Sequence, residues 1–269
     1  MAVWERIGSR GNVEDRRGMS TVAGGIGVVG IALIAGITLL AGGDLGDVAN
    51  NIFSIVEDQG LTQQNTQEFE GEDSYERFAS TVLGSNNDMW NQIFQQQNRA
   101  YTTPKLVLFR NATQSGCGIA TSDVGPHYCP FDRTIYLDET FFDELKTYLG
   151  GSNEDVAQAY VISHEVGHHI QNILGDLEGR QTNEDSIKIE LQADCYAGLW
   201  GNYISDLNIL EPNEIQEAID AASAVGDDRI QQKVEGQINP ETWTHGSSAQ
   251  RVESFNKGYT TGDFNSCRL

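Results

Sequence analysis

The chain has 269 residues, and its 39 acidic residues against 17 basic ones give it a net charge of −22 at pH 7. This balance argues against a nucleic-acid partner, because binding to phosphate groups requires a basic patch. Solubility explains so many acids better than a substrate of opposite charge does, although a cationic substrate stays an alternative.

Residues 22–41 form a run of 20 residues without a charge. Such a run can cross a bilayer as one helix, whereas the apolar core of a cleaved signal peptide has only about 7 to 15 residues. A buried glycine-rich helix of a soluble protein is the other alternative. The positive-inside rule predicts a single-pass membrane protein with residues 1–21 in the cytoplasm and the rest outside, because four arginines precede the run: Arg6, Arg10, Arg16 and Arg17.

Residues 42–72 are rich in Gly, Asp, Asn, Gln and Glu, which predicts a flexible acidic linker between the membrane and a folded domain. The remaining residues, 73–269, are numerous enough to bury one hydrophobic core. The domain is predicted to start with a helix over residues 74–99, whose apolar stripe belongs to the core: Trp90, Ile93 and Phe94.

Two short apolar segments follow, and we predict strands at residues 105–109 and 134–138. Asp138 is the expected N-cap of a helix that reaches Leu149. The strand at 134–138 is either a sheet edge, to which a substrate adds as an extra strand, or an ordinary internal strand. The sequence leaves these two alternatives open.

The four cysteines fit an oxidising compartment. Cys117 and Cys129 bracket a 13-residue stretch and are predicted to form one disulfide. Cys195 and Cys267 are predicted to form a second, which fastens the C-terminal tail to the domain. The alternatives are four zinc-binding thiols, although no C-x-x-C pair is present, or free thiols if the topology is inverted.

Residues 154–174 carry apolar side chains at helical spacing, and we predict a helix that ends at Gly175. It contains the motif H-E-V-G-H-H, in which His164 and His168 are four residues apart and share one helix face, about 6 Å from each other. They can therefore bind one metal ion. Glu165 is offset from that face and can act as the base for a water on the metal. The alternative is that this motif arose by chance on the polar face of a helix.

The identity of the third metal ligand distinguishes the groups of zinc hydrolases from one another. One large group would continue the motif with glycine at 171 and histidine at 174, but the chain has Gln171 and Leu174 there. Residues 183–204 predict a second helix, on which Glu190 and Asp194 share a face. We predict that Glu190 is the third ligand and that Asp194 accepts a hydrogen bond from a ligand histidine. The alternative for Glu190 is a solvated surface acid.

At this point the chain resembles the bacterial putative neutral zinc metallopeptidase family. The resemblance spans nearly the whole chain and implies a gluzincin-like fold with His164, His168 and Glu190 as zinc ligands and Glu165 as base. His127 departs from the family pattern, which leads us to expect an aromatic residue there. The segments that carry the resemblance are H-E-V-G-H-H-I-Q-N, E-L-Q-A-D-C-Y-A-G, S-G-C-G-I-A, P-H-Y-C-P-F-D-R-T-I-Y-L-D and T-H-G-S-S-A-Q-R-V.

A last segment, T-H-G-S-S-A-Q-R, predicts a helix capped by Ser247 or Ser248 that stops at Gly258. In other gluzincins a histidine outside the zinc motif binds the oxyanion, and the resemblance assigns this role to His245. Arg251 is expected to bind Asp194 or another buried acid, unless it lies on the surface. Two tyrosines are alternative oxyanion donors, although a tyrosine on a packed helix is more often part of the core: Tyr196 and Tyr203.

Together these patterns predict an α+β, mainly helical zincin-like domain with a small sheet, preceded by one transmembrane helix. The expected activity is a zinc-dependent peptidase, anchored to the membrane through residues 22–41, with Zn²⁺ as cofactor and a peptide or protein as substrate. Two alternatives stay open. One is a zinc-bearing binding or assembly protein of the cell envelope that cleaves nothing, and the other is a zinc amidase that acts on a non-peptide substrate.

Overall fold

The structure is a computed structural model that describes residues 2–18, 73–152, 154–179, 182–211 and 213–269. One compact unit comprises Met1–Asp15 together with Glu72–Leu269, and Arg16–Gly71 form a second. The predicted membrane span at 22–41 and the predicted linker lie outside the described residues. Among the residues that are described, no helix is both long and apolar enough to cross a membrane.

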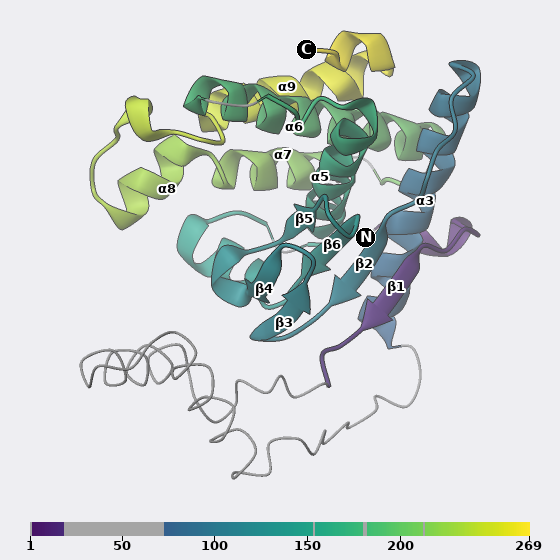
Figure 1. The fold of residues 1–269 in the computed structure, drawn as a ribbon, viewed down its shortest axis with the longest axis horizontal. Coiled ribbons are helices and arrows are strands. Elements are labelled where there is room, and N and C mark those ends of the chain that lie inside the picture. The colour runs from purple at the N-terminus through teal and green to yellow at the C-terminus, as the bar shows by residue number, and fades with distance from the viewer. Residues whose placement is uncertain (1, 19–72, 153, 180–181, 212) are drawn as a thin grey trace, which may run out of the picture. The chain divides into compact units, whose positions relative to one another are not determined.

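Helices dominate the first unit and give it the predicted α+β character (Figure 1). Three α-helices follow α6 in the described part of the chain. The α-helices are α3 (Ser74–Gln96), α4 (Phe141–Glu144), α5 (Asp155–Leu174), α6 (Asn183–Asp206), α7 (Ile215–Ala224), α8 (Asp227–Val234) and α9 (Ser248–Thr261). A π-helical turn, Leu145–Leu149, extends α4 as far as predicted.

A four-stranded sheet has the order β1-β2-β6-β5, and β3 and β4 form a separate hairpin. β1, β2 and β6 are parallel, whereas β5 runs antiparallel along β6 at the sheet edge. The sequence left open whether residues 134–138 form a sheet edge or an internal strand. β6 is an internal strand, because β5 lies between it and the edge of the sheet. The strands are β1 (Asn12–Asp15), β2 (Lys105–Leu108), β3 (Ala112–Ser115), β4 (Gly118–Thr121), β5 (His127–Cys129) and β6 (Thr134–Leu137).

The N-terminal residues correct the predicted division of the chain. The sequence sets residues 1–21 apart from the domain, but residues 2–15 pack within it. β1 pairs with β2 along four registered positions, and Trp4 stacks on Trp200 of α6. No alternation of apolar residues announces β1, whose sequence is N-V-E-D, because its place in the sheet comes from pairing with a distant strand.

The ends of the two central helices follow local rules. α5 ends at Gly175, whose left-handed backbone (φ 86°) forms the predicted C-cap. α6 starts with a capping box between Thr182 and Asp185, so its first helical residue is Asn183, where the predicted helix begins. Asp138 does not cap a helix, because its buried carboxylate accepts hydrogen bonds from Asn111, Ser122 and Thr140 instead.

Gly258 does not stop α9, which continues to Thr261 and ends at Gly262 with φ 58°. Instead, Gly258 lies where α9 crosses α6, and a Cβ on it would stand 1.9 Å from the carbonyl oxygen of Cys195. Gly198 has the same role on α6, with Phe255 opposite. Backbone contact of this kind brings α9, and the loop before it, close to the helix that carries Glu190 and Asp194.

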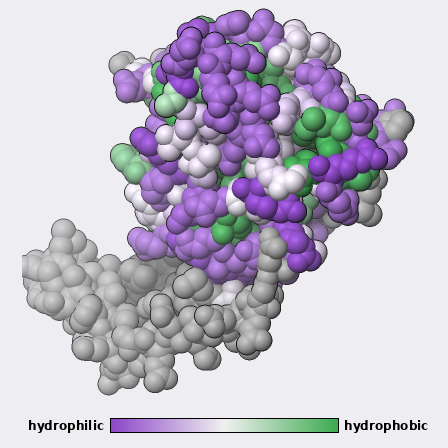
Figure 2. Space-filling view, turned by 90° about the vertical axis from the view of Figure 1, so that its right-hand side faces the viewer, coloured by the Kyte–Doolittle hydropathy of each residue, from purple (hydrophilic) through white to green (hydrophobic). Residues whose placement is uncertain are grey.

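Two disulfides brace the unit in the expected pairing. Cys117, in the β3–β4 turn, is bonded to Cys129, the last residue of edge strand β5. Cys195 of α6 is bonded to Cys267 in the short C-terminal 3₁₀ helix, Phe264–Cys267. Hydrophilic residues cover most of the face seen in Figure 2, as the strongly acidic composition requires.

Candidate metal centre

Three predicted ligands come together where α5 packs on α6. Nε2 of His164 lies 3.2 Å from one carboxylate oxygen of Glu190, and Nε2 of His168 lies 3.5 Å from the other. One ligand atom from each residue lies within 4.8 Å of the others, and no second such group occurs in the described part of the chain. Gly167, between the two histidines, lets the helices approach, since a Cβ there would stand 3.0 Å from Cα of Ala193.

The ring of His164 is held from behind by Asp194, whose Oδ1 lies 2.8 Å from Nδ1. This bond places a proton on Nδ1 and turns Nε2 toward Glu190. Burial alone would lower the pKa of His164, but Asp194 and Glu190 outweigh it and raise the pKa to about 10. The pocket therefore favours positive charge at this ring, and the same carboxylates favour a cation.

Gln171 orients the ring of His168, as Asp194 orients the ring of His164. Its amide nitrogen donates to the carbonyl of Ile189 (2.7 Å) and to Oε1 of Gln192 (2.9 Å), so its amide oxygen must face His168. That oxygen lies 2.8 Å from Nδ1 of His168, which therefore carries the proton. Both imidazoles thus present Nε2 to the same point as Glu190.

This donor set fits Zn²⁺. Two imidazole nitrogens and one carboxylate oxygen are typical of catalytic zinc sites, which leave a fourth position open. Burial acts to raise the pKa of Glu190, but His168 and His164 outweigh it and hold the pKa well below its usual range. Glu190 is therefore ionised, as a ligand must be.

Asp194 is the centre of a buried network. Its carboxylate accepts bonds of 2.8 and 2.9 Å from Nε and Nη2 of Arg251 on α9, and one of 2.6 Å from the hydroxyl of Tyr160 on α5. Arg251 is only 4% exposed, so it lies inside rather than on the surface. The pair locks α9 to the two helices that carry the candidate ligands.

Glu165 is buried (6% exposed) and lines the same cavity as the three candidate ligands. Its Oε2 atom has no hydrogen-bond partner among the described residues. A buried carboxylate oxygen without a partner is costly, so it marks a place where a water or a reacting group is expected.

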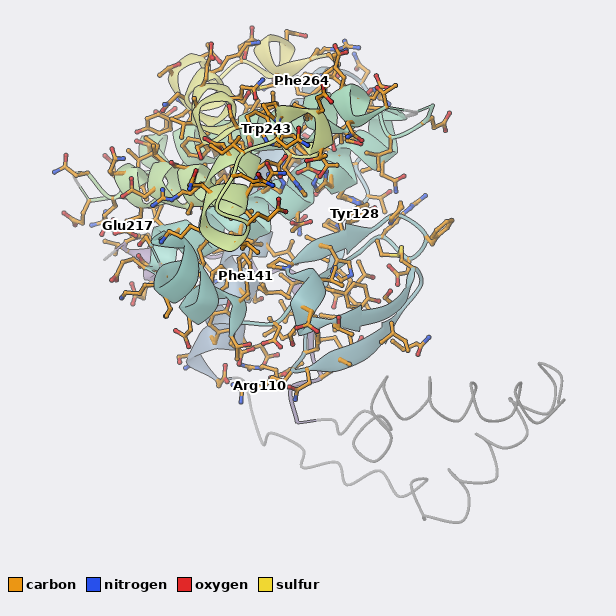
Figure 3. The ribbon with its side chains drawn as sticks, turned by 90° about the vertical axis from the view of Figure 1, so that its left-hand side faces the viewer. Arg110, Tyr128, Phe141, Glu217, Trp243 and Phe264 are labelled. Carbon is orange, nitrogen blue, oxygen red and sulfur yellow. A yellow bond between two sulfur atoms is a disulfide. The ribbon has the colours of Figure 1, made fainter. Side chains whose placement is uncertain are left out.

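The cavity has a volume of about 500 Å³ and largely apolar walls. Glu165 and Glu190 are the carboxylates among the described residues that line it. Tyr128 comes from strand β5 and Phe141 from the start of α4, and both are labelled in Figure 3. Apolar or aromatic wall residues include Tyr128, Phe141, Val161, Leu177, Val225 and Ile230.

His245 also lines this cavity, from the loop before α9. Its Nδ1 lies 3.2 Å from Oδ1 of Asp227, and the other oxygen of Asp227 accepts backbone N–H groups of Thr244, His245 and Gly246. Partial burial acts to raise the pKa of Asp227, but the hydrogen bonds from His245 outweigh it and lower the pKa. Asp227 thus fixes both the ring and the loop of His245.

Edge strand β5 forms one wall of the cavity. His127 lines it, stacks on Tyr136 and places its Nδ1 3.0 Å from the carbonyl oxygen of Gly125. The hydroxyl of Tyr128 donates to Nδ1 of His169 (3.0 Å), whose Nε2 donates to the carbonyl of Thr102. Burial lowers the pKa of His169 to about 4, so this ring is neutral and structural.

Two predicted alternatives lie away from the cavity. Tyr196 is 1% exposed and packs between Trp90 and Phe264, and Tyr203 packs against the core. Sequence patterns missed three residues of the site: Tyr160, Gln171 and Asp227. Gln171 lies one helical turn after His168 and seven residues after His164, a spacing that points to the ligand face. Nothing local announced Asp227, which meets His245 only through the fold.

The family described as putative neutral zinc metallopeptidases matches residues 2–269. The chain is 38% identical to the uncharacterized protein YpfJ of Escherichia coli over 285 residues, which cover 98% of this chain and 97% of that protein. It is 50% identical to the uncharacterized protein Rv2575 of Mycobacterium tuberculosis over 182 residues, or 62% of each chain. No solved structure matches the chain. The matched residues include all three candidate ligands, His164, His168 and Glu190. The chain belongs to the family of putative neutral zinc metallopeptidases.

Proposed function

We propose that the chain is a zinc-dependent metallopeptidase that hydrolyses peptide bonds with Glu165 as general base. One observation carries this proposal: Oε2 of Glu165 is buried without a partner in the described residues, in a cavity shared with three candidate zinc ligands. Metal binding does not need this carboxylate, since His164, His168 and Glu190 supply the three ligands. In a hydrolase, the partner of this oxygen of Glu165 would be the attacking water, whose proton the carboxylate removes.

Zinc bound at this cluster would polarise the scissile carbonyl and lower the pKa of a water to about 7. Glu165 takes the proton of the attacking water and then returns it to the leaving amine. His245 donates a hydrogen bond from Nε2 to the oxyanion when its ring carries a second proton, because Nδ1 already faces Asp227. Three further residues hold the side chains of the candidate ligands in place: Asp194, Gln171 and Arg251.

The substrate is proposed to be an extended peptide that adds to edge strand β5 through main-chain hydrogen bonds. β5 supports this because it ends the sheet and borders the cavity. The Cys117–Cys129 disulfide and the Tyr128–His169 hydrogen bond fix the strand from two directions. The apolar walls favour substrates with uncharged, apolar side chains next to the cleaved bond.

The proposed site of action is outside the cytoplasm, with attachment to the membrane through residues 22–41. Two disulfides support the compartment, because such bonds persist in oxidising surroundings and are rare in the cytosol. The uncharged run of 20 residues supports the attachment.

The test compares wild-type chain with Glu165→Gln on an unbiased peptide library and measures bound zinc in both. Glu253→Gln is the matched control, since Glu253 is an exposed acid on α9. We expect one zinc in all three proteins and a loss of cleavage of at least about 100-fold in Glu165→Gln alone. Equal cleavage by Glu165→Gln would reject the mechanism. Zinc without cleavage in wild type would favour a binding protein or an amidase.

A further inference from the structure

The N-terminal segment, residues 2–15, is bonded to the helix that carries the zinc motif. The backbone N–H of Ala2 and the indole N–H of Trp4 both donate to Oδ2 of Asp155, at 3.2 and 2.8 Å. Asp155 is the first residue of α5, nine positions before His164. The start of the described chain is thus tied to the start of this helix.

The same segment also contacts the ends of α3 and α6. The backbone N–H of Val3 donates to the carbonyl of Ile209, just after α6, at 2.8 Å. The ring of Trp4 stacks on Trp200 at 6.3 Å and meets Phe78 of α3 edge-on at 5.4 Å. Ala2 and Ile7 are 7% and 6% exposed and belong to the main hydrophobic core. Removal of this segment would expose several apolar side chains to water.

Further along, the segment runs against α3 in the direction opposite to that helix. Gly84 packs so closely that a Cβ on it would stand 2.8 Å from the backbone nitrogen of Arg10. Gly11 then exchanges two hydrogen bonds with Ser80, one turn nearer the start of α3. The chain therefore leaves β1 at the end of the unit where α3 begins, and both places lie on the same side in Figure 1.

A single membrane crossing between β1 and α3 is incompatible with these contacts. The hydrocarbon core of a bilayer is about 30 Å thick, and one crossing by residues 22–41 would leave β1 and α3 on opposite faces. β1 and β2 could then not exchange backbone hydrogen bonds, and neither could Gly11 and Ser80.

Two of the four arginines that suggested a cytoplasmic N-terminus make hydrogen bonds within the folded unit. Arg6 donates from Nη1 to the carbonyl of Asn208 at 2.7 Å, and Arg10 donates to the carbonyls of Ile7 and Ser9. Lys105 of β2 pairs with Glu14 of β1 at 2.7 Å. Because contacts within the fold account for Arg6 and Arg10, these two residues add less to the positive-inside argument.

We infer that residues 2–15 and 73–269 lie on the same side of the membrane, as parts of one folded unit. Any contact that residues 22–41 make with a bilayer then begins and ends on one face. This replaces the single-pass topology that the sequence predicts, and it is independent of the proposed zinc chemistry.

The experiment labels single engineered cysteines in the full-length chain, in its membrane-bearing host. All four native cysteines are in disulfides, so they give little background. Glu5→Cys reports on the N-terminal segment and Lys257→Cys on α9, and both positions are exposed. A membrane-impermeant maleimide is added to intact spheroplasts and, in parallel, to lysed ones. We expect the same ratio of labelling, intact over lysed, at both positions.

A second measurement tests the contact itself. Chains that carry both Glu14→Cys and Lys105→Cys are treated with a short bis-maleimide in membranes, with each single variant as control. We expect a crosslink within one chain, found by mass spectrometry of the digested protein. Opposite labelling ratios at positions 5 and 257, or a crosslink found only between two copies, would overturn the inference. Loss of peptidase activity has no bearing on either result.

Discussion

Oε1 of Gln171 lies 2.8 Å from Nδ1 of His168, and the amide nitrogen of Gln171 is committed to Ile189 and Gln192. We expect Gln171→Leu to lower zinc affinity by roughly 10- to 100-fold, because the ring of His168 loses the partner that fixes its tautomer. Titration against a zinc chelator measures this. Gln171→Glu loses the same amide donors but keeps an acceptor, so it should restore most of the affinity. Equal affinities for wild type and Gln171→Leu would reject the role.

Arg251 neutralises a carboxylate that has no access to water. Asp194 is 0% exposed and accepts two bonds from this guanidinium. Removal of one partner from a buried ion pair leaves an uncompensated charge and costs about 3–5 kcal/mol. We therefore expect Arg251→Met to lower the free energy of unfolding by that amount in urea titrations. Lys257→Met, at an exposed position on the same helix, should change it by less than about 0.5 kcal/mol. Similar midpoints for the two variants would contradict this.

The candidate ligands were predictable because their geometry is local. His164 and His168 lie on one helix, and the spacing of Glu190 and Asp194 defines one face of the next. The position of β1 was not predictable, since N-V-E-D has no strand pattern and gains its place from residues more than 90 positions later. Hydrogen bonds between segments that meet only in the fold, such as the one that Asp227 accepts from His245, leave no periodic signal.

Gly258 shows how a local rule fails when tertiary packing overrides it. Near a helix end, glycine usually marks a stop, but here it permits the crossing of α9 over α6. We expect Gly258→Ala to destabilise the fold by more than about 1–3 kcal/mol, since the new methyl group would overlap the carbonyl of Cys195. Thermal unfolding measures this. Gly8→Ala, with no atom within 4 Å of the added Cβ, is the control and should be nearly neutral. A stabilised Gly258→Ala would reject the close crossing.

Asp227 is a positioning residue for His245. Asp227→Asn should lower kcat by about 10-fold or more and leave KM and bound zinc nearly unchanged, because the oxyanion partner loses its orientation while the metal ligands do not. Steady-state kinetics on a cleaved library peptide, with metal analysis, checks this. A proportional loss of zinc would show instead that Asp227 supports the metal site.

The same aspartate has a predictable effect on acid stability. Its pKa in the folded chain is lower than its unfolded value, which is about 3.9. Its contribution to the free energy of unfolding is therefore complete above that unfolded value and disappears as the pH falls through the lower folded one. We expect wild type to lose stability relative to Asp227→Asn as the pH falls from about 5 to 2. A constant difference over that range would contradict the assignment.

The cavity walls predict which peptides are cut. Val161, Leu177 and Ile230 offer apolar contacts. Of the two carboxylates that line the cavity, Glu190 belongs to the metal cluster and Glu165 is the proposed base. Each apolar contact in such a pocket is worth about 1–3 kcal/mol, so leucine next to the cleaved bond should give a kcat/KM at least about 10-fold above lysine. Matched peptides that differ at one residue measure this. Ile230→Asp adds a carboxylate to the cavity wall, so it should raise kcat/KM for the lysine peptide and reduce the ratio between the two peptides. A preference of the wild-type chain for lysine would mean instead that its net charge of −22 selects the substrate.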